Sequence, residues 1–113
     1  MGYYRQAKQF NNRKTVVGGV TYDSIKEANY AGQLLLAKRG GLIKDFTPKP
    51  TFVLLGLDGT KVCKMIPDFL VTLPDGSEEA HEVKSKPSKT PVWRLKKKLF
   101  ESQFKDVKYV VVE

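Results

Sequence analysis

The stretch "IPDFLVTLPDGSEEAHEVKS", residues 66–85, contains an acid, a tight turn and then the triplet Glu-Val-Lys. Pro74 at the first corner and Gly76 at a left-handed position favour a three-residue loop, a type I turn followed by a glycine bulge. That loop pairs Leu73 with Ser77. The turn therefore predicts a β-hairpin and its register, and a slip of one residue would move every side chain to the other face.

Counting outward from this turn places Asp68 directly opposite Glu82, with the two Cβ atoms about 5 Å apart. Lys84 is two residues after Glu82 and shares its face, whereas Val83 points to the other side. Two carboxylates this close repel each other unless a cation lies between them. Mg²⁺ or Mn²⁺ would suit such oxygen ligands, and Lys84 would add positive charge for phosphoryl chemistry. The alternative is a solvated strand edge with an acid at its start.

The charge of the chain points to a polyanion partner. Its 20 Lys and Arg residues exceed its 12 Asp and Glu residues, which gives a net charge of +8. This balance favours nucleic acid as the partner, although a basic protein with solvated faces would have the same composition. The candidate phosphate contacts occur in an N-terminal group and in a group after the hairpin: Arg13, Lys14, Lys86, Lys89, Arg94, Lys97 and Lys98.

Other classes of protein are disfavoured. There is no apolar run of about 18 residues and no signal-peptide pattern, so we expect neither a membrane span nor export. Cys63 is the only cysteine, which excludes an intramolecular disulfide and indicates a reducing cytoplasm.

We expect a flexible basic arm over residues 1–18 and one domain over residues 19–113. A helix begins near Ser24 and ends before a Gly-Gly pair. Two apolar runs, Thr51 to Leu57 and Thr60 to Ile66, are joined by Asp-Gly, a strong hairpin signal, and the second continues through Asp68 to Leu73.

After the second hairpin, Thr90-Pro91 favours a helix start, and the helix from Val92 to Phe104 is expected to bury three apolar residues and turn its charged residues outward. The expected buried residues are Val92, Leu95 and Leu99, and those turned outward are Arg94, Lys97, Lys98 and Glu101. Val107 to Val112 is a β-branched strand. The predicted fold is α/β, in the order α-β-β-β-α-β, with a mixed central sheet flanked by two helices.

Three further residues have two interpretations each. Glu27 follows Ser24 at capping-box spacing, so it belongs either to the helix start or to the acidic site as a third carboxylate. Trp93 is either a core residue or a surface for a nucleic-acid base. His81 alternates to the face opposite Glu82 and is interpreted as structural rather than as a general base.

In this element order, Pro67-Asp68 followed by Glu82-Val83-Lys84 resembles the signature of the PD-(D/E)XK nuclease superfamily. The likeness covers residues 20 to 112, and it is greatest to small phage endonucleases of the endonuclease I and Holliday-junction-resolvase type. The segment "TYDSIKEANYAGQLLLAKRGGLIKDFTPKPTF" resembles the opening of a phage family in this superfamily, which carries an acid on its first helix. Relatives often have glycine after the motif lysine, where this chain has Ser85.

This resemblance implies a restriction-endonuclease-like core in which Asp68 and Glu82 bind the metal, Glu27 is an outer acid and Lys84 is the catalytic lysine. It implies a phage or prophage endonuclease that acts on branched or structured DNA. A nicking or restriction-like nuclease on ordinary duplex is one alternative, and a nucleic-acid-binding module without catalysis is another. A four-way junction must be cut on two strands, so a homodimer is a candidate assembly, unless the strand Val107 to Val112 is buried within one monomer.

Overall fold

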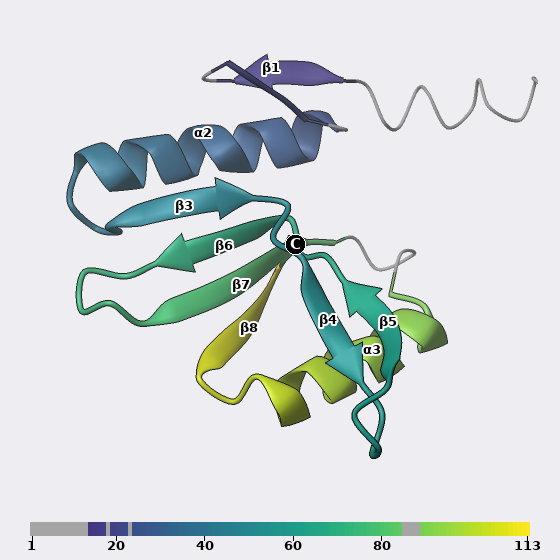
Figure 1. Cartoon of the computed structure of the whole chain (residues 1–113). Coiled ribbons are helices and arrows are strands. Elements are labelled where there is room, and N and C mark those ends of the chain that lie inside the picture. Colours follow the sequence, from purple (N-terminus) through teal and green to yellow (C-terminus); the bar gives the residue numbers. More distant parts are fainter. Residues whose placement is uncertain (1–13, 18, 23, 85–88) are drawn as a thin grey trace, which may run out of the picture. The chain divides into compact units, whose positions relative to one another are not determined.

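The computed structural model describes residues 14–17, 19–22, 24–84 and 89–113 (Figure 1). The chain divides between Gly40 and Gly41 into an N-terminal and a C-terminal unit. The fold is mixed α/β, as predicted from the sequence. Neither of the two described helices has the length and apolar character that a bilayer crossing requires.

The N-terminal unit contains a short hairpin and a helix. Strands β1 (Thr15–Val17) and β2 (Val20–Tyr22) pair antiparallel, and helix α2 (Ile25–Arg39) contacts both. The flexible arm that we expected over residues 1–18 lies mostly outside the described residues. Its last part is instead strand β1, because Thr15 to Val17 is a β-branched run.

Helix α2 begins as the capping signal predicts. The Ser24 Oγ accepts a hydrogen bond from the Glu27 backbone N–H at 3.1 Å, and Ser24 has the extended backbone of an N-cap. At the other end, the Gly40 N–H bonds the Leu36 carbonyl, and Gly41 takes a φ of +76° that favours glycine.

The C-terminal unit is built on a four-stranded mixed sheet in the order β3-β6-β7-β8 (Figure 1). Its strands are β3 (Asp45–Pro48), β6 (Phe69–Thr72), β7 (Glu78–Val83) and β8 (Val107–Val112). β3–β6 and β6–β7 pair antiparallel, whereas β7–β8 pair parallel, so the predicted mixed sheet is confirmed. Strand β3 was not predicted. It ends in Pro48, and proline is tolerated there because β3 is an edge strand.

A second, two-stranded sheet consists of β4 (Phe52–Leu55) and β5 (Lys61–Met65). The hairpin predicted around Asp58-Gly59 is thus confirmed. The expected continuation of its second strand through Asp68 to Leu73 is wrong, because β5 ends at Met65 and β6 begins at Phe69 in the other sheet. The buried Pro67 lies at the break and has no N–H to give to a strand ladder.

Helix α3 (Pro91–Gln103) packs against β4, β5 and β8. Its start is as predicted: the Thr90 Oγ1 accepts a hydrogen bond from the Trp93 N–H at 3.1 Å. Its buried face differs from the expected one, since Val92 and Leu95 are 65% and 62% exposed.

The face of α3 that packs inward carries aromatic side chains. Phe100 is fully buried, Trp93, Leu99 and Phe104 pack against the same core, and the other buried members are Leu54, Met65, Ala80 and Tyr109. Rings bury more apolar area than Val or Leu, so the aromatic stripe is the one that turns inward.

Candidate functional site: an acid pair and a lysine at the end of a hairpin

The site is positioned by the register of β6 and β7. Phe69 pairs with His81 at one end of the ladder, and the Leu73 N–H bonds the Ser77 carbonyl at 2.8 Å at the other. Gly76 has a φ of +90°, the left-handed conformation that the turn requires. The predicted register is therefore confirmed, and one further step along it sets Asp68 opposite Glu82.

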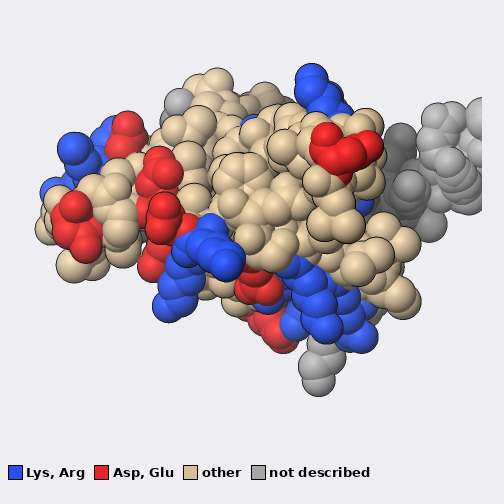
Figure 2. Space-filling view, turned by 60° about the horizontal axis from the view of Figure 1, so that its bottom comes forward, with Lys and Arg blue, Asp and Glu red and all other residues tan. Residues whose placement is uncertain are grey.

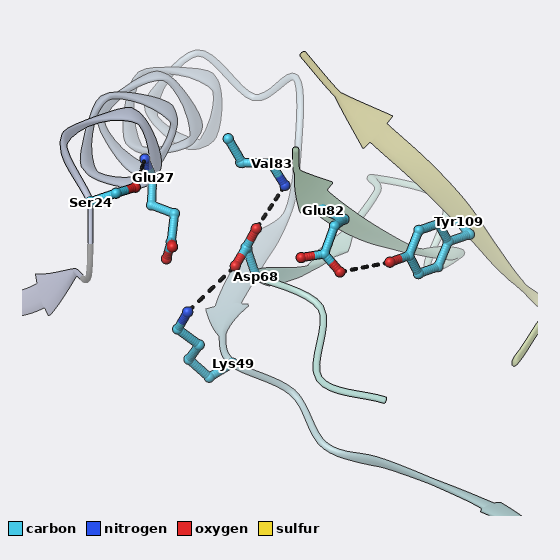
Figure 3. Close-up of polar contacts among 7 residues, drawn as sticks. All are labelled: Ser24, Glu27, Lys49, Asp68, Glu82, Val83 and Tyr109. Carbon is cyan, nitrogen blue, oxygen red and sulfur yellow. Dashed lines mark hydrogen bonds and ion pairs between the residues drawn. The ribbon is translucent and has the colours of Figure 1, made fainter. Parts of the chain in front are cut away.

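Asp68 lies in the break between β5 and β6, where only 6% of it is exposed. Its Oδ2 accepts a hydrogen bond from the Val83 N–H at 2.7 Å, and its Oδ1 lies 3.4 Å from the Lys49 Nζ (Figure 3). The Val83 bond comes from the neighbouring strand, so it holds the Asp68 carboxylate on the side where Glu82 lies. The carboxylate is thus oriented by the backbone and faced by one cation.

Lys49 also has an unusual backbone. Its φ is +53°, a left-handed value found at no other non-glycine residue that the structure describes. Its N–H bonds the Asp68 carbonyl at 2.9 Å. A lysine in this conformation is strained, and such strain gathers at functional sites. Lys49 stands between Pro48 and Pro50, which is the signal in the sequence that we missed.

Glu82 lies on β7, and its carboxylate stands between Asp68 and Tyr109 of β8 (Figure 3). The Tyr109 hydroxyl donates to Glu82 Oε1 at 2.6 Å, and the Trp93 Nε1–H donates to the Tyr109 oxygen at 3.3 Å. Burial raises the pKa of Glu82 to about 7; the Tyr109 bond and Lys84 oppose this rise, and Asp68 adds to it. Burial and the Glu82 carboxylate also raise the pKa of Tyr109. Sequence reasoning missed Tyr109, although it is the one aromatic residue in the β-branched strand β8.

Lys84 follows β7, and its N–H bonds the Val112 carbonyl at 2.9 Å. Its Nζ lies 5.1 Å from the centre of the Trp93 ring, a cation–π distance. Lys84 and Glu82 line the same pocket of about 250 Å³, together with Lys64, Lys96 and Trp93. The three members of the predicted constellation thus converge: Asp68 opposite Glu82, and Lys84 beside Glu82.

The number of carboxylates at this site is compatible with a hard divalent cation such as Mg²⁺. Among the described residues, no group of three or more His, Cys, Asp or Glu side chains could hold a metal ion. The candidate donors that the structure brings together are two, Asp68 and Glu82. Mg²⁺ is commonly held by one or two carboxylates and completes its octahedron with water and substrate phosphates. A buried acid with a raised pKa beside another carboxylate is also an arrangement that a cation would relieve.

A family model described as "Protein of unknown function (DUF1064)" matches residues 7–113. The chain belongs to the DUF1064 family. No curated protein and no solved structure matches the chain significantly. The family description names no activity, so the function of this DUF1064 chain has to be argued from its site.

Glu27 belongs to the N-terminal unit of this DUF1064 chain, in the first turn of α2. Its backbone takes part in the cap with Ser24 (Figure 3), so the capping interpretation is confirmed for the Ser24 half of the box. A role for its carboxylate at the metal site stays a prediction.

The predicted phosphate contacts have different surroundings. Arg94 and Lys98 are exposed on α3, and Lys14 is exposed before β1. Lys89 is paired with the Glu113 carboxylate. Arg13 and Lys86 lie outside the described residues. On the face that Figure 2 shows, basic and acidic side chains lie in groups around a broad uncharged area.

The prediction that Lys97 is turned outward on α3 is wrong. Lys97 is half-buried rather than turned fully outward, with its Nζ 3.0 Å from the Glu101 carboxylate and 5.4 Å from the centre of the Tyr109 ring. Lys64 and Lys96 are better placed beside the acid pair, since both line the pocket that contains Glu82. Lys64 belongs to β5 and lies only three residues before Pro67, but no local pattern marks it as part of the site.

His81 is buried and lies 2.9 Å from the Glu79 carboxylate through its Nε2. Both residues alternate with Glu82 along β7, so they share the opposite face of the sheet. The interpretation of His81 as a structural residue agrees with this position.

Proposed function

We propose that this chain is a metal-dependent endonuclease of phage or prophage origin that hydrolyses phosphodiester bonds in branched or structured DNA in the host cytoplasm. One observation carries the proposal: the β6–β7 register that sets Asp68 opposite Glu82, with Lys84 beside them in a pocket lined by lysines. A hairpin used only for stability has no need of a buried acid pair, because the pair costs free energy without a cation.

Asp68 and Glu82 would hold Mg²⁺ or Mn²⁺, and the bound ion would polarise a phosphoryl oxygen and lower the pKa of a water. The Val83 N–H orients Asp68, and the Tyr109 hydroxyl orients Glu82 through Oε1. Lys84 would stabilise the negative charge that develops on the phosphate. Glu27 is proposed as an outer acid of the same site.

The basic residues would hold the phosphate backbone of the DNA. Arg94 and Lys98 are exposed on α3, the helix whose first turn contributes Trp93 to the pocket. Phosphate contacts position a nucleic acid without reading its sequence. Selection by DNA structure is therefore proposed rather than selection by base sequence, and a homodimer would supply the second site that junction cleavage needs.

The ion pair between Lys49 and Asp68 favours a second candidate. The Lys49 ammonium already supplies positive charge to the Asp68 carboxylate, so Asp68 does not require a metal ion. This is expected if the chain is a DNA-binding module in which the acid pair has a structural role. Cleavage separates the two candidates, since the module would bind DNA and leave it intact. A nuclease that nicks or cuts ordinary duplex is the alternative within enzymes.

The test is a cleavage assay on duplex, flap and four-way-junction DNA with Mg²⁺ or with EDTA. We expect cleavage only with Mg²⁺. In Asp68→Asn we expect the cleavage rate to fall by about a hundredfold to a thousandfold, the size typical for removing one key electrostatic group. Glu78→Gln is the matched control, because Glu78 is exposed on the same hairpin. Wild-type cleavage by folded Asp68→Asn protein would refute the site, and intact DNA under every condition would favour the binding module.

A further inference from the structure

The pocket beside Glu82 has two chemically different linings. Ile66, Val92 and Trp93 form an apolar wall, and Lys64, Lys84 and Lys96 supply three cations. Its volume of about 250 Å³ lies just below the range of pockets for drug-sized ligands, so it suits a smaller group. These residues come from β5 and the residue after it, from the residue that follows β7, and from the first two turns of α3.

The apolar wall is not explained by the core. Ile66 and Val92 are 49% and 65% exposed, whereas the core of this unit is completed by Phe100 and other buried residues. Val92 lies in the first turn of α3, one residue before Trp93, and it lines the pocket with most of its surface exposed. Trp93 also packs against the core, but the exposed surfaces of Ile66 and Val92 are available to a ligand.

The cations limit what that ligand can be. The Lys96 Nζ donates to the Lys64 carbonyl at 3.3 Å, and the Lys84 Nζ lies over the Trp93 ring. Three lysines around an apolar wall complement a flat apolar group joined to an anion, which describes a nucleobase with its phosphate. A base within a duplex is stacked on both faces and cannot enter such a pocket.

We propose that this pocket binds one unpaired nucleobase together with its phosphate. Because Glu82 lines the same pocket, the bound nucleotide would lie beside the scissile bond, and this second step rests on the proposed nuclease function. The pocket then accounts for a preference for branched DNA: flaps, bulges and junctions supply unpaired nucleotides, whereas an ordinary duplex does not.

Trp93 makes the binding step directly measurable, because it is the only tryptophan of the chain. Its emission is followed in EDTA, so that no cleavage occurs, during titration with a single-stranded oligonucleotide of about eight nucleotides, within the site sizes usual for such contacts. Two other ligands are titrated for comparison: the same strand paired with its complement, and an abasic strand of equal charge. We expect quenching by the single strand and about tenfold weaker binding of the abasic strand, equivalent to about 1.4 kcal/mol.

Two variants locate the effect. The double variant Ile66→Ala, Val92→Ala should bind the single strand about tenfold more weakly and lose its preference over the abasic strand. Leu95→Ala is the matched control, since Leu95 is exposed to the same extent on the same helix and does not line the pocket. Equal quenching by duplex and single strand, equal affinity for the abasic strand, or equal losses in the two variants would each overturn the proposal.

The outcome is independent of catalysis. The titration in EDTA measures binding without turnover, so it needs no catalytic variant. A protein that binds the unpaired base and cuts no DNA would retain the pocket and refute the nuclease. A protein that cuts DNA but binds the abasic strand as tightly as the normal strand would support the nuclease and refute the nucleobase pocket.

Discussion

The two hairpins of the C-terminal unit have the same turn chemistry and different surroundings. Each turns on Asp-Gly, with glycine φ values of +83° at Gly59 and +90° at Gly76. In each, the aspartate side chain accepts a backbone N–H two residues on, at 3.0 Å from Thr60 and 2.9 Å from Ser77. The β6–β7 hairpin is central in the four-stranded sheet, whereas β4–β5 forms a sheet of its own.

The surroundings decide which hairpin can carry chemistry. Phe69, Val71 and Ala80 of β6–β7 are fully buried, and β8 lies beside β7 to supply Tyr109. Leu55, Leu57 and Val62 of β4–β5 are exposed and line a shallow apolar groove with the end of α3. The register set at the turn continues along β6–β7 but shifts between Leu54 and Leu55 in β4–β5. Only the buried hairpin can shift the pKa of an acid or orient it from a neighbouring strand.

The largest expected difference between the hairpins is in stability. Phe69→Ala removes a fully buried ring, and we expect it to lower the free energy of unfolding by about 3–5 kcal/mol. Leu55→Ala, at a half-exposed position of β4, should cost less than about 1 kcal/mol. Urea denaturation of both variants measures the contrast. Equal losses would mean that the two hairpins contribute alike to the core.

The pH dependence of stability should have opposite signs at the base and at the tips of the hairpins. Burial raises the pKa of Glu82 from 4.5 to about 7, so its charged form destabilises the folded state and stability falls as the pH rises through this range. Hydrogen bonds from Thr60 and Ser77 lower the pKa values of Asp58 and Asp75. The two charged aspartates therefore stabilise the folded state above about pH 4, and this stabilisation is lost as the pH falls.

Glu82→Gln tests this sign. We expect the variant to be more stable than the wild type at pH 8, on the order of 2 kcal/mol after allowance for solvent screening, and equal to it near pH 4. Asp75→Asn, the control, should lose stability at pH 8 and approach the wild type near pH 2. Thermal unfolding across this pH range in EDTA provides the measurement. A Glu82→Gln protein that is less stable at pH 8 would contradict the assigned direction.

The smallest expected difference is at the turns. Gly59→Ala and Gly76→Ala each force a side chain into a left-handed conformation, which costs about 1 kcal/mol, and neither new Cβ would meet an atom within 4 Å. We therefore expect equal losses in the two hairpins by thermal unfolding. A much larger loss at Gly76 would show that the turn supports more than its own hairpin.

Local rules were sufficient for much of the fold. The starts of α2 and α3 follow from Ser24 and Thr90, since capping involves only residues three apart. The opposition of Asp68 and Glu82 follows from one turn, because no bulge interrupts the β6–β7 ladder between that turn and Phe69. Sequence reasoning therefore predicted the acid pair and Lys84 before any packing was considered.

What the sequence by itself determined about this protein is the set of local elements: two capped helices, two Asp-Gly hairpins and the carboxylate pair at the end of one of them. Only the tertiary structure decided that the chain changes sheet at Pro67, that α3 buries Phe100 rather than Leu95, and that Tyr109 and Lys49 lie against the two acids. The physical reason is the range of the interactions. Turns and caps are settled within a few residues, whereas the competition between two apolar stripes, and the neighbours of a buried carboxylate, depend on segments that are distant along the chain.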